Sequence, residues 1–309
     1  MARLKGQLVR SSQPDARTAL SAPPLFVWLI VAAASAVLFL ISLPAFNQYN
    51  SGDKMFFDAS VRRLEALPER GTVKKGLRVI ALGSSLMGRA VPFDKKMEEL
   101  AEGQGLAGLE FVRVSRPNAD LKSFRPLLDA LARSRPDLIL IESDSVLYDR
   151  RDDRFFRKYA DFFRAMLMES LKSKRPVLPQ AEKVYLDNEF DIPVQVKNRG
   201  RALAAAVHAW KRRKMSAPED IKFFFSEAAR KGISVKLVRI QRSPEFEKLI
   251  HDDGLKTARL LKNYGLKSLN FPGEIRAEYY SDHAHLNSEG RAKFSLWLIE
   301  EFKKTAGGI

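Results

Sequence analysis

The chain has 309 residues, of which 45% are apolar, and its 53 Lys and Arg residues against 37 Asp and Glu give a formal net charge of +16. The apolar content excludes a disordered chain, and 17 Gly with 15 Pro exclude collagen-like and low-complexity proteins. The absence of Cys excludes disulfide scaffolds, thiolate metal sites and cysteine nucleophiles.

The first element along the chain is an apolar run from Leu25 to Leu43 that contains no charge and nothing more polar than Ser. At a rise of ~1.5 Å per residue a helix of this length covers roughly 28 Å, close to the ~30 Å of a bilayer core. Four basic residues and one acidic residue precede it, and the positive-inside rule places such a tail in the cytoplasm. We therefore predict a cytoplasmic tail over 1–24 and a single-pass helix over 25–45 in the inner (cytoplasmic) membrane, with the rest of the chain periplasmic or otherwise extracytoplasmic.

Two other interpretations of this run remain open. A cleaved signal peptide would place the cleavage near Leu43, although signal peptides have shorter apolar regions of about 7–15 residues. A buried core helix would show a polar face, and none interrupts this run.

The region from 46 to 309 is long enough for one sizeable α/β domain. Residues 46–75 are expected to form a juxtamembrane linker and helix, because apolar residues recur there at three- and four-residue steps. In 76–309, short apolar runs alternate with amphipathic stretches. The expected strands cover 77–82, 109–114, 137–141, 234–240 and 266–271, and the expected helices cover 93–104, 121–134, 153–172, 217–231, 243–263 and 288–304.

Strands that are apolar on both faces and alternate with helices predict a doubly wound parallel sheet with helices on both faces. Ligands of such sheets bind at the carboxyl ends of the strands. Residues 150–214 exceed a single crossover and are expected to be an insertion. Residues 197–214 hold seven basic and no acidic residues, which favours a membrane partner or an acidic polymer. Nucleic acid is not expected as a partner, because the domain is predicted outside the cytoplasm and shows no nucleic-acid motif.

The chemistry-bearing motifs lie at the two ends of this domain. Gly83-Ser84-Ser85-Leu86 directly follows the first expected strand. A serine in a strand-to-loop turn flanked by Gly can project its hydroxyl at the sheet edge. Before the last expected helix, Asp282 lies three residues ahead of His285. An Asp at this spacing can accept a hydrogen bond from the imidazole Nδ1–H, which leaves Nε2 free as the general base for a serine.

These two motifs resemble those of the SGNH (GDSL-like) hydrolase superfamily. Gly83-Ser84-Ser85-Leu86 matches the Gly-Asp-Ser-Leu block, with Ser84 in place of the Asp, and Asp282, His285 and Leu286 match the closing Asp-x-x-His-Leu block. The resemblance implies an SGNH-like fold with Ser85 as nucleophile, His285 as general base and Asp282 as its orienting acid. It also places Ser84 and Leu86 at the oxyanion or substrate site.

The two middle blocks of that family differ in this chain. After the second strand the family has a Gly, where this chain has no Gly and Asn118 is the alternative oxyanion donor. After the third strand the family has Gly-x-Asn-Asp, where this chain has Glu142-Ser143-Asp144. The resemblance therefore points to Asn118, Ser143 and Asp144 as oxyanion or substrate contacts, and His283 is expected to flank the site.

An SGNH-like domain behind one N-terminal membrane helix is similar to the alginate O-acetylation proteins, the peptidoglycan O-acetyltransferases and the D-alanyl-lipoteichoic acid biosynthesis protein. This likeness implies extracytoplasmic O-acyl transfer to an exported polysaccharide through an acyl-serine, beside a multi-span membrane-bound O-acyltransferase or a glycan synthase complex, without a cofactor. A polysaccharide acyl esterase and a catalytically inactive scaffold or polymer-binding subunit remain alternatives. A metal site formed by Asp282, His283 and His285 is a further alternative, but no metal is expected, because the Asp-x-x-His pairing already accounts for two of these residues.

Overall fold

The structure is a computed structural model of the whole chain, and it describes residues 24–49, 52–68, 76–149, 155–173, 199–251, 259, 261–266 and 268–307. The chain forms two compact units, Met1–Asn47 and Gln48–Ile309. Apart from Pro24, the predicted cytoplasmic tail lies outside the described residues.

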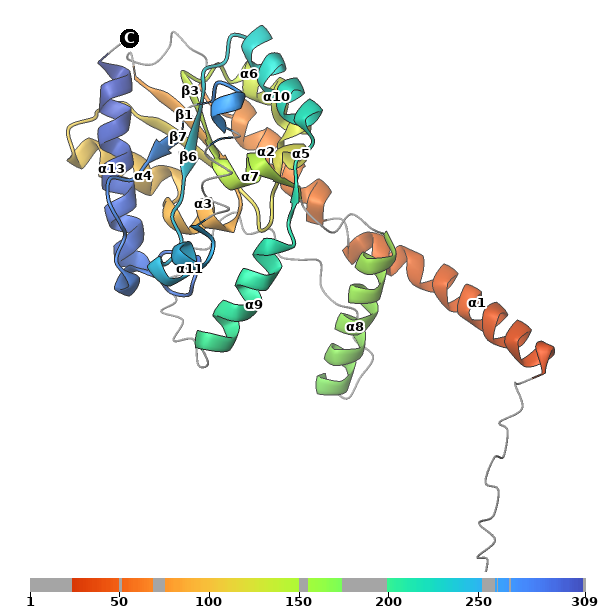
Figure 1. Cartoon of the computed structure of the whole chain (residues 1–309). Helices are drawn as coiled ribbons and strands as arrows, with labels where there is room; N and C mark the ends of the chain where they lie inside the picture. Colours follow the sequence, from red (N-terminus) through yellow and green to blue (C-terminus); the bar gives the residue numbers. More distant parts are fainter. Residues whose placement is uncertain are drawn as a thin grey trace, which may run out of the picture. The chain divides into compact units, whose positions relative to one another are not determined.

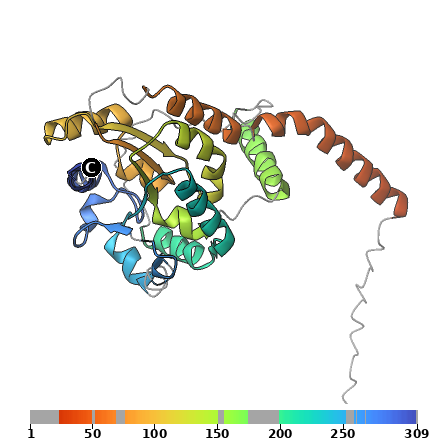
Figure 2. The same cartoon turned by 90° about the horizontal axis from the view of Figure 1, so that it is seen from above.

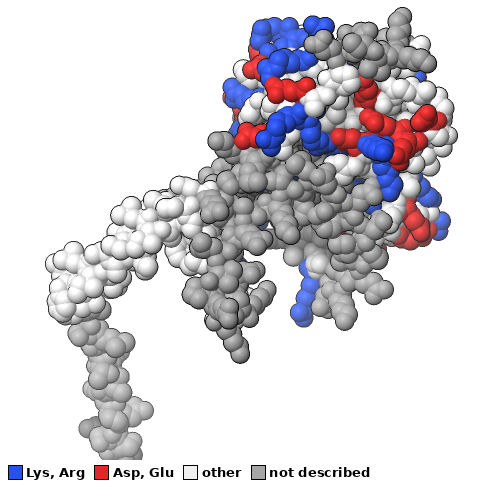
Figure 3. Space-filling view, turned by 180° about the vertical axis from the view of Figure 1, so that it is seen from behind, with Lys and Arg blue, Asp and Glu red and all other residues white. Residues whose placement is uncertain are grey.

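Helix α1 extends over Leu25–Tyr49, and all but its last two residues belong to the first unit. Its segment Leu25–Asn47 has a mean hydropathy of 2.6 and is the one helix among the described residues that is long and apolar enough to cross a membrane. The surface of α1 shows neither basic nor acidic side chains in Figure 3. Length and composition thus agree with the apolar helix predicted over 25–45.

The second unit is built on a five-stranded sheet in the order β2-β1-β3-β6-β7. The strands are β1 (Arg78–Gly83), β2 (Glu110–Ser115), β3 (Leu138–Glu142), β6 (Val235–Arg239) and β7 (Ser268–Asn270). All neighbouring pairs are parallel, and β1 and β3 are buried along their whole length. The prediction of a doubly wound parallel sheet is confirmed.

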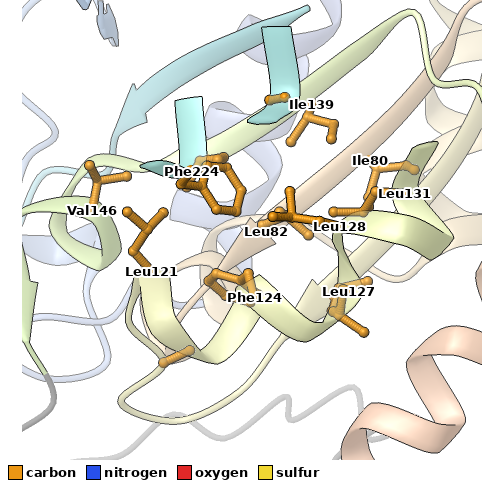
Figure 4. Close-up of a cluster of buried hydrophobic side chains, with 14 of the residues drawn as sticks. Ile80, Leu82, Leu121, Phe124, Leu127, Leu128, Leu131, Ile139, Val146 and Phe224 are labelled. Carbon is orange, nitrogen blue, oxygen red and sulfur yellow. The ribbon is translucent and has the colours of Figure 1, made fainter. Parts of the chain in front are cut away.

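Helices cover both faces of this sheet (Figures 1 and 2). Because side chains alternate along a strand, Ile80 and Leu82 of β1 point to one face and Val79 and Ala81 to the other. The first face is covered by α2 (Gly52–Glu65), α5 (Leu121–Phe124), η1 (Arg125–Leu127), α6 (Leu128–Arg133) and α10 (Pro218–Arg230), and the second by α3 (Ser85–Ala90), α4 (Asp94–Gly103) and α13 (Ser288–Ala306). Figure 4 shows the first core, in which side chains of β1 and β3 meet those of α5, η1, α6 and α10.

The strand register brings three strand ends to one edge. Gly83 at the end of β1 pairs with Ser115 at the end of β2, and Leu82 pairs with Ile141 of β3. In the sheet, β2 lies on one side of β1 and β3 on the other, so the order of the strands reverses beside β1. This edge is therefore the switch point at which doubly wound sheets bind ligands. Ser84, Ser85 and Glu142 all lie here.

Two expected helices differ in detail. The helix predicted over 121–134 is divided into α5, η1 and α6, because Pro126 has no N–H to donate within a continuous helix. The helix predicted over 243–263 begins as α11 (Pro244–Leu249), and residues 252–258 lie outside the described residues.

The predicted insertion leaves and rejoins the domain at one point. Strand β4 (Tyr148–Asp149) pairs antiparallel with β5 (Lys214–Met215), and between them the structure describes α8 (Phe155–Ser173) and α9 (Arg199–Lys211). On the face shown in Figure 3, basic and acidic side chains of the described residues lie interspersed. The described residues on that face therefore do not form a uniform basic surface.

A pair of leucines on α13 tests the second core. Leu298 is completely buried and Leu296 is 38% exposed. We expect Leu298→Ala to lower the free energy of unfolding by about 2–5 kcal/mol, because it leaves a cavity beneath the sheet. Leu296→Ala should cost less than about 1 kcal/mol. Denaturant unfolding of the full chain in detergent measures both, and equal losses would contradict this packing.

Candidate active site

The proposed nucleophile lies in a tight turn between β1 and α3. Ser84 caps α3, and its side-chain oxygen accepts a hydrogen bond from the Leu86 N–H at 3.2 Å. A Cβ on Gly83 would lie 2.4 Å from the Met87 Cβ and 2.8 Å from a carboxylate oxygen of Glu142. The turn therefore closes only with Gly at position 83, and it places Ser85 as the first residue of α3.

The second part of the site is the loop that precedes α13. Tyr280 and Leu286 form a β-bridge, and the Ser281 N–H donates to the His285 carbonyl at 2.9 Å. Inside this closed loop, one carboxylate oxygen of Asp282 accepts the backbone N–H groups of Ala284 (2.7 Å) and His285 (2.8 Å). Asp282 is thereby fixed with its second oxygen free to reach the imidazole.

The two parts meet through side chains. Asp282 Oδ2 lies 2.8 Å from His285 Nδ1, and His285 Nε2 lies 3.0 Å from Ser85 Oγ. An ionised Asp282 can only accept, so Nδ1 carries the proton and Nε2 accepts from the Ser85 hydroxyl. The structure thus brings together the three residues predicted from the sequence, and each is partly exposed, so that a substrate can reach them.

The charge of Asp282 is well supported. Partial burial by itself raises the pKa of this carboxyl, but the hydrogen bond and charge of His285 and the two backbone N–H donors hold the pKa well below its ordinary value. Asp282 is therefore ionised at any pH at which the protein would be assayed, and it can stabilise an imidazolium on His285.

A buried carboxylate, Glu142, holds the nucleophile turn from below. One of its oxygens accepts the backbone N–H groups of Ser84 (2.7 Å) and Met87 (3.2 Å), and the other accepts the Ser84 hydroxyl at 2.7 Å. Burial and the neighbouring Asp144 raise the pKa of Glu142, while its bonds to Ser84 act in the opposite direction. Glu142 ties the end of β3 to both ends of the turn that carries Ser85.

Three other predicted contacts are turned into the protein. The hydroxyl of Ser84 is committed to Glu142, Leu86 packs in the second core, and the buried Ser143 hydroxyl donates to the Val238 carbonyl at 2.9 Å. Their placement gives them structural roles and lends no support to the expected contact with substrate.

The remaining predicted contacts lie at the surface of the site or beside it. Asn118 is exposed and has a left-handed backbone (φ 55°), which Asn tolerates better than most residues. Asp144 forms an ion pair with Arg242. His283 stacks on Phe246 with ring centroids 5.6 Å apart. Of these residues, Asp144 contacts Arg242 and His283 contacts Phe246, and both partners belong to a cluster of arginine and aromatic side chains.

The contacts of His285 do not favour a metal site formed by Asp282, His283 and His285. Both ring nitrogens of His285 are engaged, one by Asp282 and one by Ser85. Among the residues that the structure describes, no group of three His, Asp and Glu side chains is arranged to hold a metal ion.

Comparison with known proteins gave matches to solved structures only. No protein-family model and no curated protein matches the chain. The lipase/acylhydrolase from Enterococcus faecalis shares 11% identity over 74% of this chain and 96% of its own, with a TM-score of 0.38. The family 3 carbohydrate esterase of Clostridium thermocellum (10%, 75% and 100%, TM-score 0.37) and the aryl esterase of M. smegmatis (12%, 74% and 100%, TM-score 0.35) match similarly. At this level the likeness establishes no activity for this chain, whose chemistry has to follow from its own triad.

Two residues of the site were not predicted from the sequence. Glu142 is one of them, and the signal that could have found it is an acidic residue at the end of an apolar strand at the switch edge. Arg242 lies just after β6, and nothing in its local sequence indicates an ion pair with Asp144 across the sheet edge.

The raised pKa of Glu142 predicts a dependence of stability on pH. A carboxyl whose pKa is higher in the folded than in the unfolded state loses stabilising free energy as pH rises above its unfolded pKa of about 4.3. In Glu142→Gln, the amide oxygen can keep the two N–H donors and the amide NH2 can donate to Ser84. We therefore expect this variant to gain stability relative to the wild type as pH rises from about 4 to neutrality.

The measurement is denaturant unfolding of both proteins across this pH range, and a difference that is constant with pH would contradict it. Glu142→Ala serves as the control for the hydrogen bonds. It leaves the turn's buried donors without an acceptor and should be less stable than Glu142→Gln by roughly 1–3 kcal/mol at every pH, because neither variant titrates at this position.

Proposed function

We propose that this chain is a serine acyl-transfer enzyme of the SGNH type, in which Ser85 carries the acyl group. The observation that supports it is the continuous hydrogen-bond chain from Asp282 through His285 to Ser85, with distances of 2.8 and 3.0 Å. A hydroxyl bonded to an imidazole that a carboxylate orients is the arrangement that activates serine nucleophiles.

The mechanism follows from these contacts. His285 Nε2 takes the Ser85 proton as Oγ attacks the ester or thioester carbonyl, and the resulting imidazolium is stabilised by Asp282. The same proton then passes to the leaving alcohol or thiol, which leaves an acyl-serine. His285 next removes a proton from an acceptor hydroxyl, the acceptor takes the acyl group, and the Ser85 hydroxyl is restored.

The oxyanion needs hydrogen-bond donors. In the nucleophile turn, the N–H groups of Ser84, Leu86 and Met87 are already bonded to Glu142 or to the Ser84 hydroxyl. The Ser85 N–H has no acceptor among the described residues and is the backbone donor that we assign to the oxyanion. Asn118, exposed in the loop that follows β2, is the side-chain donor in this proposal.

The acceptor in our proposal is a hydroxyl of an exported polysaccharide, and the acyl group is acetyl. The apolar helix α1 supports anchoring at a membrane, which would place the domain beside a multi-span O-acyltransferase or glycan synthase complex. Transfer in place of hydrolysis would require the acceptor to exclude water from the acyl-serine.

Turnover of a small acetyl ester tests the nucleophile. We expect Ser85→Ala and His285→Ala each to lower kcat/KM by at least about 10³-fold while leaving the unfolding transition in place. Leu296→Ala, on the exposed side of α13, serves as the folded control. Full turnover in Ser85→Ala would overturn the acyl-serine, and no turnover or acyl adduct in the wild type would favour a scaffold. Release of free acetate with no transfer to added polysaccharide would favour an esterase.

The role of Asp282 is tested separately with Asp282→Asn. The amide can donate to His285 Nδ1, which stabilises the tautomer that carries its proton on Nε2 and so removes the general base. We expect kcat to fall by about 10⁴-fold, as for other triads of this type. A loss of less than tenfold would show that His285 does not need this carboxylate.

A further inference from the structure

A cluster of arginine and aromatic side chains lies next to the loop that carries Asp282 and His285. We call it the arginine–aromatic cluster; its members are Tyr148, Trp210, Arg213, Arg242, Phe246 and His283. Trp210 and Phe246 are buried and meet edge to face with centroids 6.0 Å apart. The cluster joins the end of α9, the start of α11 and the loop of Asp282.

The cluster is continuous with the catalytic loop. The Phe246 ring stacks on His283 with an interplanar angle of 17°, and the Ser243 N–H donates to the His283 carbonyl at 3.1 Å. His283 precedes the general base His285 by two residues. The cluster is therefore connected to the loop that carries Asp282 and His285 by ring stacking and by one backbone hydrogen bond.

The two arginines of the cluster differ in how their charge is used. Arg242 is buried, forms an ion pair with Asp144, and lies 4.1 Å from the centroid of Trp210. Its charge is neutralised inside the protein, and its guanidinium serves as a platform between Asp144 and the ring.

Arg213 keeps its charge available. Its guanidinium lies 4.5 Å from the Trp210 centroid and 5.7 Å from that of Tyr148, and its backbone N–H donates to the Trp210 carbonyl at 2.9 Å. Its side chain reaches solvent, and among the described residues no carboxylate pairs with it. Burial and, after it, the positive charge of Arg242 lower the pKa of Arg213. The carboxylates of Asp144 and Glu142 act in the opposite direction and raise it.

We propose that Arg213 binds an anionic group, a carboxylate or a phosphate, on the substrate whose ester Ser85 attacks. A guanidinium presents paired donors that match both anions, and the rings behind Arg213 hold it in place and limit competition from water. This inference rests on the proposed acyl transfer and adds to it the class of substrate: an acylated acidic saccharide in preference to a neutral one.

The test compares acetyl esters of a neutral sugar, a uronic acid and a sugar phosphate on the full chain in detergent. We expect the wild type to prefer at least one acidic ester, and Arg213→Gln to lower the ratio of acidic to neutral kcat/KM by about tenfold, the loss of one charge-assisted hydrogen bond. Whether the uronate or the phosphate ratio falls identifies the anion. Arg213→Lys, which keeps the charge but not the paired donors, should retain part of the preference.

Arg212→Gln is the matched control, because Arg212 is the exposed neighbour with no assigned contact in the cluster, and it should leave the ratio unchanged. An equal ratio in Arg213→Gln and in the wild type for both acidic esters would overturn the inference.

Binding to the Ser85→Ala chain separates this inference from the proposed function. Calorimetric titration with acidic and neutral oligosaccharides requires no turnover. If this chain prefers the acidic oligosaccharide and loses the preference when Arg213→Gln is added, the result supports the anionic site. It does so even if no ester is turned over, and in that case only the acyl-transfer proposal fails. Equal binding of the two oligosaccharides would overturn the site, whatever the esterase result.

Discussion

The hydrogen bond between His285 and Ser85 joins residues that lie 200 positions apart, and most of the domain serves to make it possible. Ser85 follows β1, an inner strand of the sheet, and His285 lies three residues before the start of α13. Helices α3 and α13 pack on the same face, where the Ser295 hydroxyl donates to the Ala90 carbonyl at 3.4 Å. The position of α13 against α3 thus sets the distance from the His285 imidazole to the Ser85 hydroxyl.

Three carboxylates lie at this edge of the sheet, and their surroundings give each a separate role. Asp282 is kept ionised by His285 and two backbone donors, and it orients the base. Asp144 is balanced by Arg242, which in turn lies on Trp210. Glu142 is fully buried, its pKa is raised, and it holds the turn of Ser85. Only the first contacts the imidazole of His285, whereas the other two fix the geometry around it.

Features with local causes could be predicted from the sequence. The strands could be located because β1 and β3 are apolar on both faces, and the pairing of Asp282 with His285 because a three-residue spacing suffices to close it. Features that depend on tertiary contact could not. The bond of Ser84 to Glu142 joins residues 58 positions apart, and the ion pair of Arg242 with Asp144 joins residues 98 positions apart. Nothing near either residue in the sequence shows the partner.

The proposed function depends on the activation of Ser85 as a nucleophile by His285. Its most direct test is reaction with a serine-directed fluorophosphonate, followed by peptide mapping in a mass spectrometer, since this needs no knowledge of the natural substrate. We expect a single covalent adduct on Ser85 in the wild type, and a strongly slowed reaction in His285→Ala. An adduct on other serines only, or a rate unchanged in His285→Ala, would contradict the account.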